Sequence, residues 1–226
     1  MININCATRL TEAEFWNHGA LGLSLRRLVH DDRLRACIVY ENGRGLPAIY
    51  NERIAAADAG QVQVFVHDDV WLDDHFFGEH LLAGVQEFDV IGVAGNRRRA
   101  PNQPSWAFQL HDSKLEWDDR ANLSGAVSHG KSPFGIISSF GAVPASCELM
   151  DGVLLAARTQ VLREHQLLFD ERFQFHFYDM DFCRSARVKN LRLGTWPIAI
   201  THQSKGGFGT NGWIESYKTY LQKWGD

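Results

Sequence analysis

The chain has 226 residues, of which 45% are hydrophobic and 22% are charged, and its formal net charge is −4 at pH 7. This length and apolar fraction suffice for one large domain with a buried core and exclude an intrinsically disordered chain. Domains that bind nucleic acid are usually strongly basic, so the mild negative charge argues against a nucleic-acid partner.

The N-terminal segment MININCATRLTEAEF has no basic start followed by an apolar run, which argues against a signal peptide. No stretch approaches the roughly 18 uncharged apolar residues of a transmembrane helix. We therefore expect a cytoplasmic protein without a transmembrane segment. The four cysteines form neither a CxxC pair nor a metal-binding spacing, which is typical of buried thiols in a reducing compartment: Cys6, Cys37, Cys147 and Cys183.

The first half of the chain alternates between helical and extended patterns. Thr11 followed by Glu14 forms a capping box that predicts the start of a helix. After it, the pattern predicts a strand over 35–40, a helix from Pro47 to 58, a strand over 61–70, a helix over 73–86 and a strand over 88–95. This order predicts an α/β fold with a mostly parallel central sheet flanked by helices.

The second half begins with an irregular stretch. Residues 96–146 are rich in Gly, Ser, Pro, Asn and Arg with isolated aromatics, which predicts long functional loops. Regular patterns then predict a strand over 149–158, helices over 159–166 and 179–190, a strand over 191–202 broken at Pro197, and a helix over 213–224. We expect the aromatic face of this last helix to pack on the domain, with dimerisation or contact with a lipid-linked acceptor at a membrane surface as alternatives.

Polar residues that could carry chemistry follow one of the predicted strands. His67, Asp68 and Asp69 end the strand in FVHDDV, and ligands of open α/β sheets bind at the carboxyl ends of strands. His67 and Asp69 share a face because side chains alternate along a strand. Such a cluster fits a divalent cation such as Mg²⁺ or Mn²⁺, and a solvated acidic turn is the alternative.

Further candidates lie near the C-terminus. Asp179 and Asp181 stand at a predicted helix start, where one of them is either a general base or an N-cap. His202 ends an apolar strand, where it could be a metal ligand, and Lys205 in the Gly-rich loop that follows could supply the counter-charge for a phosphate. A structural histidine in a turn is the alternative. The segment GAVSHGKS (125–132) matches the P-loop spacing but lacks the strand and helix that a P-loop requires.

Taken together, these segments resemble the family-2-like glycosyltransferases of the GT-A fold. That family has an Asp-Gly before a strand, an FDE-F segment, an ED-D-C-R helix start and a later strand ending in His. The matching segments here are MDGVLL (150–155), FDERF (169–173), YDMDFCR (178–184) and IAITH (198–202). The YN and FVHDDV segments (50–70) are closest to the branch resembling a streptomycin-biosynthesis glycosyltransferase domain.

The resemblance runs from about Ala36 to His202 and implies one GT-A domain over 1–226. It implies a nucleotide-binding half over 1–95, an acceptor half over 96–202, and a Gly-rich loop with a C-terminal helix over 203–226. The segment MININCAT must supply the first strand of the nucleotide-binding half, although it lacks the usual apolar run.

The resemblance also implies a role for each matching residue. Asp69 matches the last Asp of the DxD metal motif, His67 occupies its first position, where Asp is usual, and His202 matches the late His of the metal site. Asp179 matches the catalytic base of the ED pair, and Tyr178 replaces the acidic residue before it. The implied donor-binding residues are Asn51, Asp68, Asp151, Gly152 and Lys205.

The function implied by the resemblance is that of a metal-dependent inverting glycosyltransferase of the hexosyltransferase type (EC 2.4). With Mn²⁺ or Mg²⁺, it would transfer a sugar from a UDP- or GDP-sugar donor to a hydroxyl of a carbohydrate or lipid-linked acceptor. The cation stabilises the departing diphosphate, and Asp179 takes the acceptor proton. The same residues leave three alternatives open: a metal-dependent nucleotide-sugar hydrolase, a nucleotidyltransferase and a non-catalytic sugar-nucleotide-binding domain.

Overall fold

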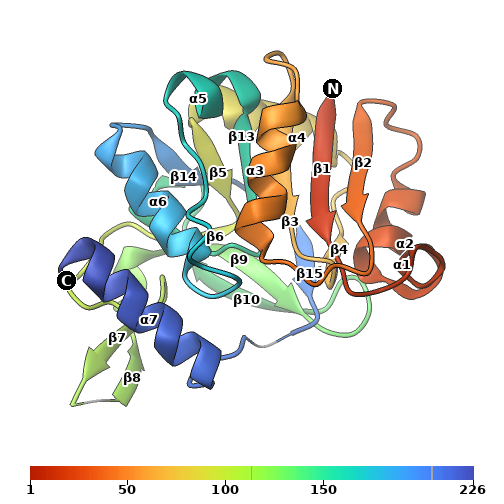
Figure 1. Ribbon diagram of the computed structural model, residues 1–226. Helices are drawn as coiled ribbons and strands as arrows, with labels where there is room; N and C mark the ends of the chain where they lie inside the picture. The colour runs from red at the N-terminus through yellow and green to blue at the C-terminus, as the bar shows by residue number, and fades with distance from the viewer. Residues whose placement is uncertain (113, 205) are drawn as a thin grey trace.

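The computed structural model describes residues 1–112, 114–204 and 206–226, and a seven-stranded sheet lies at the centre of this described part (Figure 1). In spatial order its strands are β11 (Ala145–Ser146), β14 (Leu193–Thr195), β5 (Val90–Gly92), β13 (Leu154–Arg158), β3 (Val62–Val66), β1 (Ile2–Ala7) and β2 (Leu34–Val39). The α/β fold class is confirmed.

The central sheet is mixed, whereas the sequence predicts a mostly parallel one. Strand β1 runs parallel to β2 and β3, and β5 runs parallel to β14. Strand β13, however, is antiparallel to both β3 and β5, and β11 is antiparallel to β14. The reason is that the chain leaves β5 at the carboxyl edge of the sheet and returns at the same edge, since Leu154 at the start of β13 pairs with Val66 at the end of β3.

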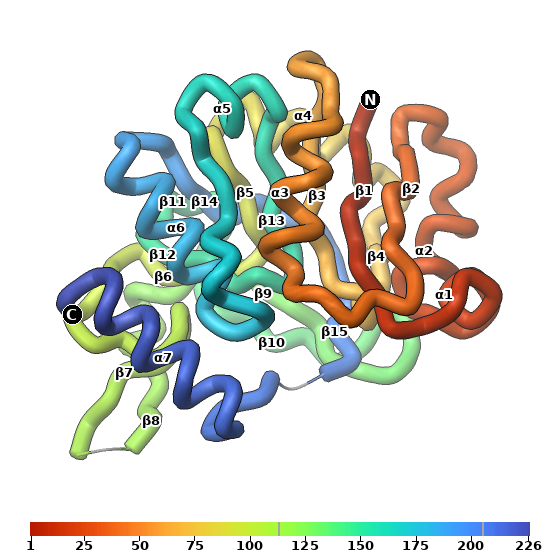
Figure 2. Tube along the Cα trace, viewed as in Figure 1, coloured from red at the N-terminus to blue at the C-terminus, as the bar shows by residue number. Residues whose placement is uncertain are grey.

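Helices cover the central sheet, and α3 and α6 lie in front of it in Figures 1 and 2. The α-helices are α1 (Glu12–His18), α2 (Ala20–Arg27), α3 (Leu46–Ala56), α4 (Phe77–Glu87), α5 (Thr159–Glu164), α6 (Tyr178–Val188) and α7 (Asn211–Trp224). The capping box of Thr11 and Glu14 opens α1 as predicted. Within the described residues, no helix has the length and apolarity to cross a membrane.

Strand β1 lies between β2 and β3 although its sequence lacks an apolar run. Ile2 and Ile4 are fully buried and alternate with Asn3 and Asn5, which are buried as well. The Asn3 side-chain amide donates a 2.7 Å hydrogen bond to Gln61, just before β3, and the Asn5 amide donates a 3.1 Å bond to Gln63 in β3. The Gln63 amide in turn donates a 2.8 Å hydrogen bond to the Thr159 hydroxyl at the start of α5. Buried amide hydrogen bonds thus replace apolar packing on one face of this strand.

A second sheet occupies the region where the sequence predicts mainly irregular loops. It contains β12 (Leu149–Met150), β6 (Ala94–Asn96), β9 (Leu123–His129), β15 (Ile200–His202) and β4 (Val70–Leu72), with β10 (Ile136–Gly141) paired to β9. A hairpin of β7 (Phe108–His111) and β8 (Lys114–Trp117) projects beside α7, and a 3₁₀ turn spans Arg120–Asn122. The GAVSHGKS segment runs along β9 into a turn before β10, so its context is not that of a P-loop.

Four of the predicted strands are each divided between the two sheets. The predicted strand over 61–70 becomes β3 in the central sheet and β4 in the second, and 88–95 becomes β5 and β6. Likewise, 149–158 becomes β12 and β13, and 191–202 becomes β14 and β15. The backbone therefore bends between the sheets at four places, and polar residues of the predicted site stand at or beside several of these bends.

Helix α7 packs back onto the domain, as predicted. The Trp224 indole donates a 2.9 Å hydrogen bond to the buried Asp181 carboxylate, and the Lys223 ammonium lies 2.7 Å from the same carboxylate. Arg184 of α6 lies over the Trp224 ring, 4.3 Å from its centroid. Asp181 therefore fastens α7 to α6, and it does not line the cavity described below.

We expect Lys223→Met to lower the free energy of unfolding by about 3 kcal/mol, because the buried Asp181 carboxylate would lose its cationic partner. The measurement is urea unfolding at pH 7. Adding Asp181→Asn to the Lys223→Met variant removes the unpaired charge and is expected to recover part of the loss. A double variant that is less stable than the single one would contradict this explanation.

Candidate active site

A cavity of about 760 Å³ brings together most of the site residues predicted from the sequence. His67 and Asp69 come from the bend between β3 and β4, and Asp151 and Gly152 come from the bend between β12 and β13. Asp179 in the first turn of α6 and His202 at the end of β15 line the same part of the cavity. Segments far apart in the sequence thus meet at the junction of the two sheets.

His67, Asp69 and His202 form a group with the geometry of a cation site. One ligand atom from each lies within 4.8 Å of the others. The His202 Nε2 atom lies 3.2 Å from the Asp69 carboxylate and 3.0 Å from the Ser204 hydroxyl. Backbone contacts hold the group in place, since the His67 amide donates to Val153 and the Gln203 amide donates to Asp69.

The electrostatics differ between the two histidines of this group. Burial, reinforced by His202, lowers the pKa of His67, so its ring is neutral at pH 7. Burial tends to raise the pKa of Asp69, but the contacts with His202 outweigh it and lower that pKa. Burial likewise opposes protonation of His202, yet Asp69 raises its pKa. Two imidazoles and a carboxylate suit a first-row transition-metal ion better than Mg²⁺, which prefers an all-oxygen set.

Tyr178 sets the tautomer of His67. The Tyr178 hydroxyl donates a 2.8 Å hydrogen bond to the carbonyl oxygen of Gly152, which uses its one proton. It therefore accepts the 2.9 Å hydrogen bond that joins it to His67 Nε2. This places the His67 proton on Nε2 and leaves the lone pair on Nδ1. The residues at which the chain departs from the family pattern, His67 and Tyr178, are thus hydrogen-bonded partners.

We expect Tyr178→Phe to weaken Mn²⁺ binding by about tenfold, because His67 would lose the acceptor that fixes its tautomer and ring orientation. Titration monitored by electron paramagnetic resonance measures this directly. Tyr217→Phe is the control, since the Tyr217 hydroxyl donates to Asn102 outside the site. Equal Mn²⁺ affinity in wild type and Tyr178→Phe would rule out this positioning role.

Asp179 has the properties of a proton acceptor near neutral pH. Burial, together with the nearby Asp151 carboxylate, raises the pKa of Asp179 to about 7. Backbone amides of Gly152 and Met180 donate hydrogen bonds of 2.9 Å to its two oxygens and fix its orientation. Position 152 requires glycine, because a Cβ there would collide with the Tyr178 hydroxyl and the Asp179 side chain.

Asp151 is held by Trp106, a residue that the sequence did not assign to the site. The Trp106 indole donates a 2.7 Å hydrogen bond to one Asp151 oxygen, and the Val153 amide donates to the other at 2.8 Å. In the sequence, the sign that marks Trp106 is its isolation as an aromatic residue in a polar segment. Its hydrogen bond places this residue, with Asp151, at the polar end of the cavity.

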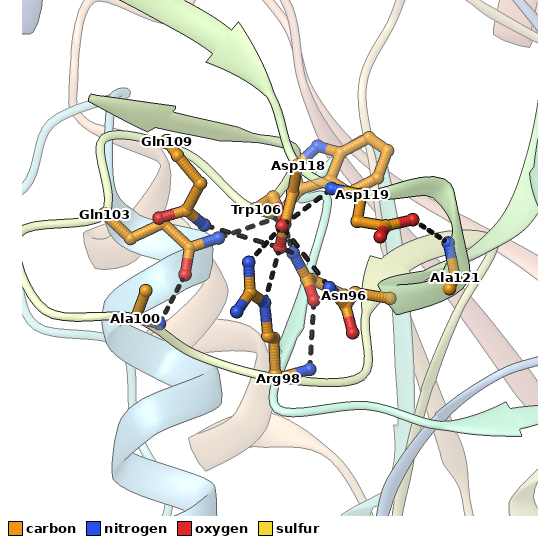
Figure 3. A network of polar contacts seen from close by, with 10 residues as sticks. Asn96, Arg98, Ala100, Gln103, Trp106, Gln109, Asp118, Asp119 and Ala121 are labelled. Carbon is orange, nitrogen blue, oxygen red and sulfur yellow. Dashed lines mark hydrogen bonds and ion pairs between the residues drawn. The ribbon is translucent and has the colours of Figure 1, made fainter. Parts of the chain in front are cut away.

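The backbone of Trp106 is itself fixed by a buried polar network (Figure 3). Asn96 and Gln103 donate hydrogen bonds of 2.9 and 3.1 Å to the Trp106 carbonyl. Asn96 also donates to Asp118, which forms an ion pair with Arg98. Burial opposes ionisation of Asp118, but its bonds to Arg98 and Asn96 hold its pKa well below the ordinary value. The network thereby ties the loop carrying Trp106 to β6.

The remaining predicted donor-binding residues lie elsewhere. The Asp68 carboxylate accepts a 2.5 Å hydrogen bond from Thr8, which follows β1, and it is not part of the cavity lining. The Asn51 side chain donates a 2.9 Å hydrogen bond to the Phe169 carbonyl and accepts one of 2.9 Å from the Phe169 amide. Asn51 therefore fastens the loop before α6. Lys205 lies outside the described residues.

Comparison with known proteins identifies the family. Residues 35–210 match the family described as "Glycosyltransferase like family". The chain belongs to this glycosyltransferase-like family. No curated protein matches its sequence.

Two solved structures show how this glycosyltransferase-like chain relates to the GT-A fold. GalNAc-T7, solved with UDP, GalNAc and Mn²⁺, aligns with a TM-score of 0.54 and 9% identity over 98% of this chain. The catalytic domain of Drosophila β1,4-galactosyltransferase 7, solved with xylobiose, aligns with a TM-score of 0.51 and 8% identity over 96% of this chain and 79% of its own. The present chain spans 48% of the GalNAc-T7 chain. These likenesses establish the fold, which is that of GT-A glycosyltransferases.

Proposed function

We propose that this domain is a metal-dependent, inverting glycosyltransferase that moves a sugar from a nucleotide-diphosphate donor to an acceptor hydroxyl. The observation that carries the proposal is one cavity that holds both the His67, Asp69 and His202 group and the Asp179 carboxylate. Such a transfer needs a counter-charge for the departing diphosphate and a base for the incoming hydroxyl.

The cation proposed for this site is Mn²⁺, with Mg²⁺ the weaker candidate because of the two imidazole ligands. When bound, the cation supplies a positive charge next to the diphosphate oxygens. Asp69 would contribute the anionic ligand, and His67 and His202 would contribute imidazole nitrogens, with the cation displacing the proton that Asp69 favours on His202. A Mn²⁺ ion is present with UDP in the GalNAc-T7 structure, which supports a donor of the UDP-sugar type here.

The proton acceptor is Asp179. Its backbone hydrogen bonds orient it, and its raised pKa gives it the basicity to take a proton from an acceptor hydroxyl near pH 7. A single base that works opposite the leaving group corresponds to inversion at the anomeric carbon. Asp151 and Gly152 line the same end of the cavity, where we assign them to the donor sugar, and Asp68 beside Thr8 is assigned to the nucleotide.

The finer features of the proposal follow the family resemblance. They are a nucleotide-binding half over 1–95, an acceptor half over 96–202, hexosyl transfer, a relationship to the streptomycin-biosynthesis branch and a cytoplasmic location. The acceptor is a carbohydrate or a lipid-linked compound.

The deciding experiment measures UDP and GDP release from a panel of nucleotide sugars, with and without Mn²⁺ and with and without acceptors. Mn²⁺-dependent release that increases with an acceptor and yields an inverted glycoside supports the transferase. Release that is equal without any acceptor indicates a hydrolase, pyrophosphate or mononucleotide products indicate a nucleotidyltransferase, and binding without any release indicates a non-catalytic domain.

We expect the transfer rate to rise with pH through about 7. The pKa of Asp179 is raised to about 7, so the carboxylate form that accepts the proton predominates above this pH and falls to about one tenth at pH 6. The measurement is kcat between pH 5.5 and 8.5 at saturating donor and Mn²⁺. A rate that is constant between pH 6 and 8 would exclude Asp179 as a base with this pKa.

A further inference from the structure

Away from the carboxylates, the cavity is walled by aromatic rings. The described lining includes Phe108 and Trp117 of the β7–β8 hairpin, Phe140 of β10, Phe208 before α7 and Trp213 in the first turn of α7. Trp106, whose ring centroid lies 5.0 Å from that of Phe140, joins this wall to the carboxylate end. These rings touch one another: the centroids of Phe108 and Trp117 are 4.5 Å apart, and those of Phe108 and Phe208 are 5.3 Å apart. The wall is therefore continuous across separate elements.

Two of the polar groups next to this wall are engaged within the protein. The Trp106 indole donates to Asp151. The Ser105 hydroxyl oxygen accepts hydrogen bonds from the Ala107 and Phe108 amides at 3.2 and 3.1 Å. The carboxylates and the His67 and His202 rings are concentrated at one end of the cavity. A ligand that extends from there along the wall meets mainly ring carbon.

The outer part of the wall is exposed although it is apolar. Trp117 is 58% exposed and Phe208 is 43% exposed, and both line the cavity. The hairpin continues outward with two more apolar side chains, Leu110 and Leu115, at 37% and 39% exposure. Figure 1 shows this hairpin projecting from the body of the molecule next to α7. Large apolar side chains grouped at the mouth of a cavity are typical of a ligand-binding surface.

We propose that the acceptor is amphiphilic, with its reacting hydroxyl at Asp179 and an apolar group, aryl or alkyl, against the aromatic wall. This inference rests on the proposed transferase function and specifies its acceptor. An acceptor made of several sugar units fits less well, because each unit brings hydroxyl groups that need hydrogen-bond partners, and the outer wall offers few. An apolar aglycone needs none and covers the exposed rings of Trp117 and Phe208.

The test measures binding without turnover. Methyl, cyclohexyl, phenyl and octyl β-glycosides of glucose and galactose are titrated into the full chain and observed by ligand NMR. We expect the phenyl or octyl glycosides to bind at least about tenfold more tightly than the methyl glycosides, the effect of about one aromatic contact. Trp117→Ala and Phe208→Ala are each expected to remove most of this preference. Phe76→Ala, which deletes a 63% exposed ring away from the cavity, is expected to retain it.

The outcomes separate the two sources of an apolar group. Tighter binding of phenyl than of cyclohexyl glycosides identifies an aromatic aglycone, and tightest binding of octyl glycosides identifies an alkyl chain, as in a lipid-linked acceptor. Equal binding of methyl and apolar glycosides overturns the inference, as does a preference that survives in both Trp117→Ala and Phe208→Ala. Because no turnover is needed, such a result leaves the transferase proposal standing, whereas an absence of transfer from any donor contradicts that proposal itself.

Discussion

Asp179→Asn is expected to lower kcat by about 10³-fold while leaving Mn²⁺ binding intact. The amide keeps the shape of the side chain but cannot accept the proton of the acceptor hydroxyl, and general-base catalysis contributes about 10²–10⁴-fold. The measurement is the initial rate of transfer at saturating donor. Asp181→Asn is the matched control, because Asp181 lies on the same helix but contacts Lys223 and Trp224. A variant at position 179 that keeps more than about one tenth of kcat would assign the base to another group.

The same variant carries a stability signature that shows whether it is folded. The folded-state pKa of Asp179 is about 7, above the value of 3.8 for a free carboxyl group, so the folded wild type binds more protons than the unfolded chain between these values. The contribution of Asp179 to the free energy of unfolding of the wild type is therefore lost as the pH rises from about 4 to 7. Without metal, the melting temperature of Asp179→Asn relative to wild type is expected to increase between pH 5 and pH 8. A pH-independent difference would contradict the raised pKa.

Asp69→Asn is expected to weaken Mn²⁺ binding by more than about 100-fold and to lower transfer in parallel, since even residues behind the ligands affect metal affinity by 10–100-fold. The substitution removes the anionic member of the group and the partner of His202 at 3.2 Å. Calorimetric titration with Mn²⁺ measures the affinity. Asp74→Asn is the control, because Asp74 pairs with His80 of α4 and is not in the cavity lining. Unchanged Mn²⁺ affinity in Asp69→Asn would remove this group as the metal site.

Most of the polar end of the cavity was predictable because it is encoded in short motifs. His67 and Asp69 follow a strand directly, Asp179 opens a helix, and His202 ends a strand, so local patterns mark each of them. Their meeting in one cavity could be inferred from the order of these motifs in the family resemblance. No sequence pattern shows the hydrogen bond between His67 and Tyr178, because it depends on how α6 approaches β3.

Other features could not be predicted because their signals are not periodic. The family resemblance implies a strand at MININCAT, but it does not reveal the buried hydrogen bonds of the Asn3 and Asn5 side-chain amides that hold β1, because alternating asparagines do not look like a core strand. The aromatic wall is assembled from rings far apart in the sequence, such as Phe108 and Phe208. Asn51 stands in a helix, α3, as expected, but the helix alone does not reveal that its amide contacts the main chain of Phe169.

The bends between the two sheets determine how firmly the floor of the cavity is held. Three backbone hydrogen bonds join these bends or the chain beside them: the His67 amide to Val153, the Asp151 amide to Ala94 and the Gln203 amide to Asp69. Each bend is covalently continuous with a strand of both sheets, so we expect these bonds to open together with the sheets rather than by the fraying of one loop. The amide hydrogens of His67 and Asp151 should then exchange with solvent only when both sheets separate, which makes the floor of the cavity as durable as the fold itself.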